Sequence, residues 1–226
     1  MTSAPERLAS EMVAEACVTR HHGRPGLPAR SKVGWADRAA DQVGAHDLVT
    51  CATHFLAHPH PTVRQVGLAL LARPDVDAAT AERLARELAD DPDWEVREWV
   101  VEPLAAHTAR EASGWLERWV QEGRGRRRAA VVAARQLVRH KDIDCVTALK
   151  VATAVVDDPD PYVAASVGTF LLADGIYPTC PDAFRAWVAS LGPCPPDSPR
   201  LRHLAAVVRR HPASAPGGQR PGPLQR

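Results

Sequence analysis

The sequence lacks the cysteine patterns of a metal or redox site. Its cysteines are widely scattered, none forms a CxxC pair, and no set of Cys and His residues has zinc-ligand spacing. The five residues are Cys17, Cys51, Cys145, Cys180 and Cys194. An odd, scattered set is typical of buried or surface thiols in a reducing cytosol. We therefore expect free thiols and no metal or other cofactor.

The chain also lacks long apolar segments and a strong charge of either sign. Apolar runs such as VGLALLA at 66–72 fall far short of the roughly 20 residues that a membrane span requires. The first residues mix Glu and Arg among apolar positions, unlike a signal peptide. We expect a cytoplasmic protein with no membrane contact. The formal net charge is only +1, so contact with a polyanion depends on local clusters.

No Gly-rich phosphate loop, GxSxG nucleophile elbow or kinase motif set is present. From residue 47 onward no segment alternates as a strand does. The chain consists instead of amphipathic stretches separated by short breaks. The expected helices lie at 4–19, 35–43, 47–58, 62–73, 78–89, 93–105, 109–121, 126–139, 143–156, 160–173, 181–191 and 199–210.

From residue 47 onward the helices form pairs, and the second helices of four pairs begin in similar ways. Asp or His beside Pro leads into an aliphatic helix in three of them, and RGRRR opens the fourth. These starts recur about every 33 residues, as in stacked helical hairpins. Asp93 and Asp160 are the expected N-caps. We predict an all-α fold, a right-handed α-solenoid of HEAT-like helical-hairpin repeats.

Three parts are expected along the chain. Residues 1–45 form an N-terminal helical cap and residues 46–211 form the HEAT-like repeat array. Residues 212–226 form a disordered tail, because this Gly/Pro-rich segment has almost no bulky apolar residues to bury. A stacked helical array is first of all a binding surface, and we expect it to act as a monomer.

Trp94 and Glu98 are the candidate catalytic residues. They are four positions apart, about one helical turn, so their side chains leave the same face of the helix 93–105. Each also has a purely structural explanation. Trp94 would pack against a neighbouring repeat, and Glu98 would be a solvated charge beside Arg97.

A basic run opens the helix predicted at 126–139. The candidate DNA-binding residues are Arg124, Arg126, Arg127, Arg128 and Arg135. Arginine binds phosphate through charge-assisted bonds, and the glycines at 123 and 125 leave the helix N-terminus open to an anion. A solvated helix with basic ends is the alternative explanation. A second basic group lies near the C-terminus, at Arg200, Arg202, Arg209 and Arg210.

Other conspicuous residues are better explained by the fold. His54, His58 and His60 lack the HExxH pattern and a nearby carboxylate, so we expect ordinary surface or interface histidines. Trp115 and Trp119 have helical spacing, which indicates packing between repeats.

Over about residues 50–190, helix by helix, the chain resembles the AlkD-type DNA glycosylases, HEAT-like DNA alkylation repair proteins of bacteria. In that family a Trp is followed four residues later by an essential Asp, and here Glu98 follows Trp94. The family motif Arg-Ala-Ala matches the segment that begins at Arg128. The family also has a Gly-Trp that follows an aromatic-Val start, whereas Thr169 follows the glycine here.

This resemblance implies a protein that binds alkylated double-stranded DNA and hydrolyses the N-glycosidic bond of a cationic N3- or N7-alkylated purine. Glu98 would stabilise the sugar cation, Trp94 would pack at the lesion, and Arg128 would hold the backbone. Glu98 and Thr169 depart from the family pattern. The alternative is therefore a non-catalytic HEAT-repeat scaffold that binds DNA or a protein partner.

Overall fold

The computed structural model describes residues 3–21 and 24–212. The predicted tail lies, apart from residue 212, outside the described residues. The chain divides into two compact units, residues 1–115 and 116–226, which are described separately. The predicted boundary at 45/46 falls beside the kink at Gly44, and that division stays a prediction.

The first unit begins with α1 (Ala4–Val18), whose start is closed by a capping box of Ser3 and Glu6. Two short antiparallel strands, β1 (Arg20–His21) and β2 (Arg24–Pro25), precede α2 (Ala29–Leu56). The expected helices 35–43 and 47–58 are both parts of α2, which is kinked at Gly44 with φ 73°. The remaining helices are α3 (Pro61–Leu71), α4 (Ala78–Leu88), α5 (Trp94–Trp99), α6 (Val101–Ala106) and α7 (Ala109–Trp119), whose residues 116–119 belong to the second unit.

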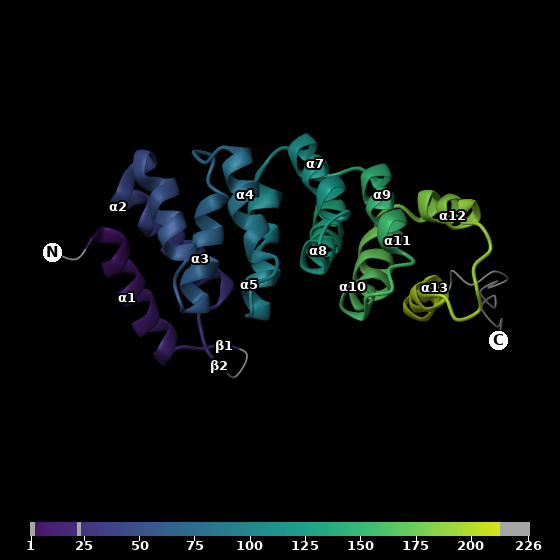
Figure 1. Ribbon diagram of the computed structural model, residues 1–226, viewed down its shortest axis with the longest axis horizontal. Helices are drawn as coiled ribbons and strands as arrows, with labels where there is room; N and C mark the ends of the chain where they lie inside the picture. The colour runs from purple at the N-terminus through teal and green to yellow at the C-terminus, as the bar shows by residue number, and fades with distance from the viewer. Residues whose placement is uncertain (1–2, 22–23, 213–226) are drawn as a thin grey trace, which may run out of the picture. The chain divides into compact units, whose positions relative to one another are not determined.

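The core of the first unit lies where α2 packs along α3, as Figure 1 shows. All but two residues of α3 are buried, and α5 and α6 pack on its other side. The expected helix 93–105 is divided into α5 and α6. Pro103 has no N–H to donate to the carbonyl of Trp99, which accounts for the break.

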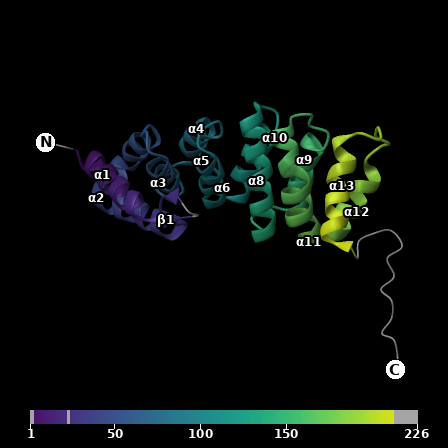
Figure 2. The same ribbon diagram turned by 90° about the horizontal axis from the view of Figure 1, so that it is seen from below.

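The second unit holds α8 (Arg124–His140), α9 (Cys145–Val155), α10 (Pro161–Ser166), η1 (Val167–Ile176), α11 (Tyr177–Thr179), α12 (Pro181–Ser190) and α13 (Pro199–Arg210). The expected helix 160–173 continues after α10 as the π-helix η1, which packs against α8 on one side and α13 on the other (Figure 2). A Cβ on Gly175 would lie 3.1 Å from the Cα of Arg135, and one on Gly168 would lie 2.9 Å from the Cα of His203. Both contacts need glycine because the facing backbone is so close.

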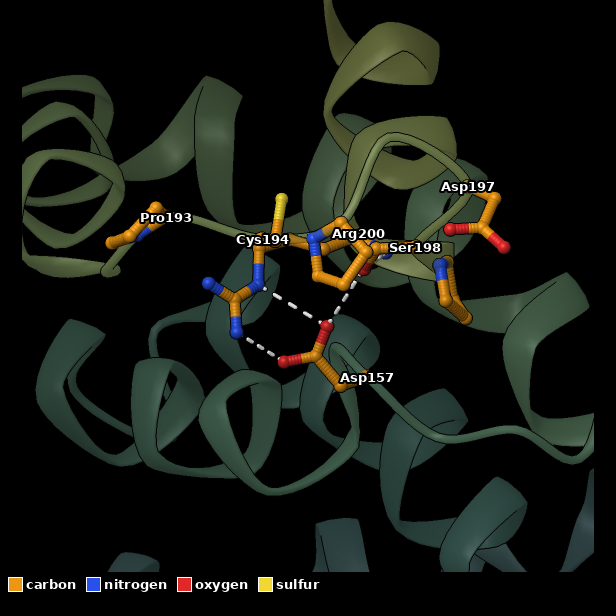
Figure 3. A pocket seen from close by; sticks show the side chains of 8 residues that line it. Asp157, Pro193, Cys194, Asp197, Ser198 and Arg200 are labelled. Atoms are coloured by element: carbon orange, nitrogen blue, oxygen red, sulfur yellow. Dashed lines mark hydrogen bonds and ion pairs between the residues drawn. The ribbon is translucent and has the colours of Figure 1, made fainter.

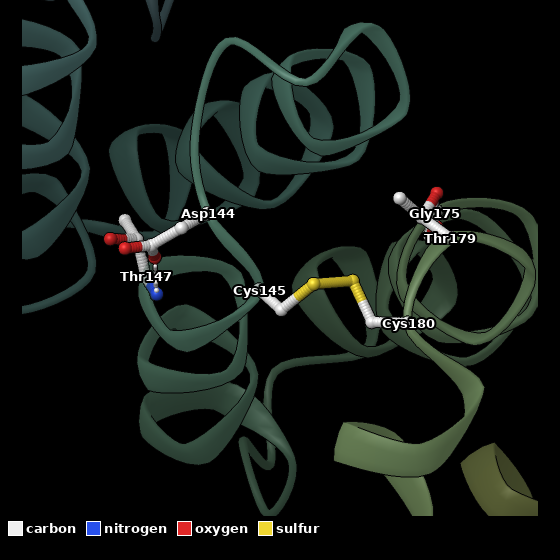
Figure 4. The surroundings of a disulfide bond; sticks show 6 residues. All are labelled: Asp144, Cys145, Thr147, Gly175, Thr179 and Cys180. Atoms are coloured by element: carbon white, nitrogen blue, oxygen red, sulfur yellow. Dashed lines mark hydrogen bonds between the residues drawn. A yellow bond between two sulfur atoms is a disulfide. The ribbon is translucent and has the colours of Figure 1, made fainter.

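One prediction about the cysteines is wrong. Cys145 and Cys180 form a disulfide, with their Cα atoms 6.2 Å apart, and join the start of α9 to the end of α11 (Figure 4). Cys17, Cys51 and Cys194 are thiols, as expected. The sequence could not reveal the pair, because its members are 35 residues apart and meet only through the packing of helices.

The prediction of an all-α fold of HEAT-like hairpins is confirmed, since helices form nearly all regular structure in the described residues. In residues 3–21 and 24–212, no helix is long and apolar enough to span a bilayer.

Candidate nucleic-acid interface

The start of α5 presents the first pair of candidate residues. Trp94 and Glu98 both lie on this short helix in the first unit, and the Trp94 side chain is 45% exposed. Burial of so large an apolar ring would normally be favourable. The Trp94 ring is therefore partly accessible to solvent, while Glu98 is half-buried.

The turn before α5 fixes where this helix begins. Asp93 caps it by accepting hydrogen bonds from the backbone N–H of Glu95 (2.8 Å) and Val96 (3.4 Å). Asp91 accepts the N–H of Asp93 (2.8 Å) and is held by Arg64 through Nε at 2.8 Å and Nη2 at 2.9 Å. This two-point ion pair is almost fully buried and ties α5 to α3.

Two residues near α5 carry no distinctive sequence signal. The ammonium of Lys32 lies 4.9 Å from the centre of the Trp99 ring, and the residue is only 3% exposed. Burial lowers the pKa of Lys32, and the carboxylates of Glu95 and Asp93 oppose that shift. Glu102, one turn beyond Glu98, is half-buried, and burial raises its pKa. No pattern in the sequence distinguishes these two charges from ordinary surface ones.

The candidate arginines all lie on α8 in the second unit, and Arg126 and Arg127 contact acidic groups. Arg127 donates through Nε to Asp158 (2.6 Å) and through Nη1 to the carbonyl of Glu122 (2.7 Å). Arg126 lies 3.4 Å from the carboxylate of Glu122. Arg127 therefore joins two repeats, just as Arg64 does in the first unit.

Two other arginines of α8 lie against aromatic rings. The guanidinium carbon of Arg128 is 4.9 Å from the centre of the Tyr162 ring, and that of Arg135 is 5.9 Å from the centre of the Phe170 ring. Arg124 is exposed at the first position of α8, whose N-cap Gly123 provides no side-chain acceptor. These side chains lie on the helix where phosphate contacts were predicted.

The predicted histidine group has a structural role at another turn. His58 accepts the backbone N–H of His60 through Nδ1 at 3.0 Å, and His60 accepts that of Thr62 at 3.3 Å. His60 is thus the N-cap of α3. No group of His, Cys, Asp and Glu among the described residues is arranged to hold a metal ion.

The basic group near the C-terminus is partly neutralised. Arg200 binds Asp157, which also accepts the Ser198 hydroxyl at 3.1 Å, beside a pocket of about 380 Å³ that Cys194 helps to line (Figure 3). The hydrogen bond from Arg200 lowers the pKa of Asp157. Arg210 lies 3.2 Å from Asp174. This group is therefore a weaker candidate for phosphate binding than α8.

Comparison with solved structures identifies the fold. The crystal structure of AlkD2 from Streptococcus mutans matches with a TM-score of 0.74 and 15% sequence identity, covering 91% of this chain and 98% of that chain. The structure of smu.31 from Streptococcus mutans UA159 matches with a TM-score of 0.68 and 13% identity over the same shares. The fold is AlkD-like.

No family model matches the chain, and no curated protein matches it significantly. At 13–15% identity the AlkD-like likeness concerns the fold alone. It agrees with the fold that the sequence motifs implied. Trp94 and Glu98 lie together on α5 in the first unit, and the five arginines lie together on α8 in the second.

Proposed function

We propose that this protein is a DNA-binding HEAT-like repeat protein of the DNA alkylation repair type. It acts in the cytoplasm as a monomer on alkylated double-stranded DNA. Its activity is that of a glycosylase that hydrolyses the N-glycosidic bond of a cationic N3- or N7-alkylated purine. Trp94 and Glu98 are the proposed catalytic residues.

One observation carries the enzymatic part of this proposal. Trp94 exposes nearly half of its surface one helical turn from a carboxylate, at the start of a helix that a buried ion pair holds in place. A rigid support of this kind keeps an aromatic ring and a charge ready for a ligand. The AlkD-like fold is consistent with this arrangement, and the resemblance of the Trp94–Glu98 motif to the AlkD-type glycosylases supports base excision as the reaction.

The chemistry demands little of the protein. An alkylated purine is already cationic, so the C1′–N bond breaks with its electron pair moving to the base, which leaves as a neutral molecule. The sugar becomes a cation like an oxocarbenium ion, and the Glu98 carboxylate stabilises that charge and orients the water that adds to C1′. The water then loses its proton to solvent. Trp94 attracts the cationic base by its ring face.

The arginines of α8 are the proposed phosphate contacts. Arg128 is the principal one, with Arg124, Arg126 and Arg135 beside it. Arg127 was also predicted to bind DNA. Because its guanidinium already binds Asp158 and a backbone carbonyl, we expect it to support α8 more than to contact phosphate.

The second candidate function is a non-catalytic module that binds DNA or a protein. Thr169 favours it, because the position where the related motif has a second Trp holds an exposed, small polar side chain. Glu98 also favours it, since its side chain is one methylene longer than the Asp of the motif.

Release of 7-methyl- or 3-methylpurine from alkylated duplex DNA tests the enzymatic proposal. We expect release by the natural protein and a fall on the order of 10²–10³-fold in Glu98→Gln, because the amide cannot offset the sugar charge. Glu87→Gln, at an exposed position of α4, is the matched control and should behave as the natural protein. Equally little release by the natural protein and Glu98→Gln would leave the non-catalytic module.

Salt dependence of duplex binding then separates the partners of that module. Affinity that falls steeply with salt indicates phosphate contacts. Arg128→Gln should weaken duplex binding uniformly across sequences and lower the salt slope by about one. No binding to duplex at any salt concentration would point to a protein partner instead.

A further inference from the structure

Phe170 exposes an aromatic ring in the second unit. Phe170 lies on η1 and is 43% exposed. Among the exposed large hydrophobic residues of the described part of the chain, Phe170 and Trp94 are the aromatic ones. A single exposed apolar residue is ordinary on a protein surface. A binding role for Phe170 therefore depends on the side chains that surround it.

Two arginine–aromatic pairs lie along the contact between α8 and the next repeat. Arg128 faces Tyr162 on α10, and Arg135 faces Phe170 on η1. The two arginines are seven residues apart, so they lie on one face of α8 and about 10.5 Å apart along its axis. They form a strip in which cations and rings alternate.

Arg135 is positioned at a cost in hydrogen bonding. Within the described residues, its buried Nε has no hydrogen-bond partner. An unsatisfied buried donor is rare and calls for an explanation other than stability. The close approach of Gly175 to the Arg135 backbone fixes where this side chain starts. The guanidinium is thus held over the Phe170 ring by packing.

The strip has an excess of positive charge. Helix α8 contains no acidic residue. Three nearby carboxylates have cationic partners: Glu122 lies by Arg126, Asp158 binds Arg127, and Asp174 lies by Arg210. A fourth, Asp160, accepts the backbone N–H of Tyr162. An anionic ligand would therefore meet little repulsion here.

We propose that Phe170 and Tyr162, with Arg135 and Arg128, form a platform that binds unpaired nucleotides of a DNA strand. An unstacked base lies against the exposed face of Phe170, and the flanking phosphates pair with the two arginines. Rings that accept bases of any kind beside cations that follow the backbone are the usual means of binding single strands. This inference rests on the proposed binding of DNA, and it adds a preference for an extrahelical or single-stranded base.

Fluorescence anisotropy with the full chain tests the platform. The probes are a fully paired duplex, the same duplex with one bulged adenine, and the single strand. We expect the bulged and single-stranded probes to bind more tightly than the paired duplex. Phe170→Ala should lower the affinity for these two probes by on the order of tenfold or more and leave the affinity for the paired duplex unchanged.

Three variants separate stacking from general effects. Phe170→Trp should keep the preference, and Phe170→Leu, which keeps apolar bulk without a π face, should lose it. Leu201→Ala removes another exposed apolar side chain of the second unit and should change nothing. Circular dichroism checks that each variant is folded.

The outcomes divide cleanly. Equal binding of all probes, or full binding by Phe170→Ala or Phe170→Leu, overturns the platform while leaving duplex binding and excision intact. A preference for unpaired bases that depends on Phe170, without base excision, supports the platform and removes the glycosylase activity. Absence of binding to every probe overturns both.

Discussion

The turns at 58–60 and 91–93 have one shape and different chemistry. In each, the side chain of the first residue accepts the N–H of the third, at 3.0 Å in His58-Pro59-His60 and at 2.8 Å in Asp91-Pro92-Asp93. The third residue then caps the following helix. The turn at 158–160 in the second unit has the same aspartate pattern. Asp158 accepts the N–H of Asp160, and Asp160 accepts the N–H of Tyr162, both at 2.9 Å.

The difference lies in how many bonds the first side chain can accept. A carboxylate has two oxygens, so Asp91 and Asp158 hold their own turns and also bind Arg64 and Arg127 of the preceding repeats. A neutral imidazole has one acceptor nitrogen, which His58 uses within its turn. The aspartate side chains therefore join neighbouring repeats, whereas the His58 side chain serves only its own turn, which is connected to Asp91 through backbone carbonyls that accept from Arg64.

Removing a shared carboxylate should have the largest effect. Asp91→Ala leaves Arg64 without its carboxylate at a site where the side chains are 12% and 5% exposed. We expect a loss of about 3–5 kcal/mol in the free energy of unfolding, because breaking one side of a buried ion pair strands the other charge. Urea denaturation followed by tryptophan fluorescence measures it. Asp182→Ala, in the exposed pair with Arg185, should cost at most about 1 kcal/mol. A loss of that small size for Asp91→Ala would show that the Asp91–Arg64 pair contributes no more stability than an exposed ion pair.

The disulfide adds a second difference between the units. It anchors α9, the helix that precedes the turn at 158–160, whereas the described cysteines of the first unit, Cys17 and Cys51, are thiols. Cys180→Ser should lower the stability of the second unit by about 2–4 kcal/mol relative to the oxidised protein. Thermal denaturation with and without a reducing agent checks this. The natural protein in the reducing agent should match the variant, and an unchanged Tm in both would contradict the prediction.

The two kinds of cap should differ in strength. Asp93 accepts two backbone N–H groups, and His60 accepts one at the longer distance of 3.3 Å. We expect Asp93→Ala to cost about 1 kcal/mol of unfolding free energy and His60→Ala clearly less. Hydrogen exchange of the first-turn amides of α5 and α3 locates each effect. If His60→Ala accelerated exchange at α3 more than Asp93→Ala accelerated it at α5, each relative to the natural protein, the His60 cap would be the stronger one and the prediction would be wrong.

The smallest expected effect is a pH dependence confined to the histidine turn. Burial lowers the pKa of His58 and of His60 below the ordinary 6.5. The unfolded chain therefore binds protons first as the pH falls, so the stabilisation is complete above pH 6.5 and decreases below it. Other histidines also titrate in this range. The double variant His58→Asn/His60→Asn, which keeps an acceptor without a titrating group, should have a flatter profile of Tm between pH 7.5 and 5 than the natural protein. Identical profiles would contradict the role of these two residues.

Most helices could be predicted because their ends are marked locally. Asp93, Asp160 and the prolines beside them define helix starts, and the expected and observed boundaries of α1, α4 and α13 agree within about one residue. The division of α5 from α6 depends on one missing N–H, and the π-helix depends on contacts with α8 and α13. Such features follow from packing between segments far apart in the sequence.

The candidate site was predictable to a lesser degree. Spacing placed Trp94 and Glu98 on one helix face, and the charge run placed the arginines on α8. Sequence alone could not show that Arg127 binds Asp158, because a salt bridge and a phosphate contact require the same residue type. Phe170 had no signal either, since an exposed ring and a buried one read alike among aliphatic neighbours.

The glycines of η1 also limit how the protein can be engineered. Replacing a helical glycine with alanine usually stabilises a protein by up to about 1 kcal/mol, so consensus design would favour it. At Gly168 and Gly175 the added methyl group would press on the backbones of α13 and α8. The π-helix η1 can lie this close to α13 and α8 because the side chains of Gly168 and Gly175 are single hydrogen atoms. A library that varies this segment should therefore keep both glycines fixed, together with Phe170 for its proposed role, and place its diversity at the exposed Thr169.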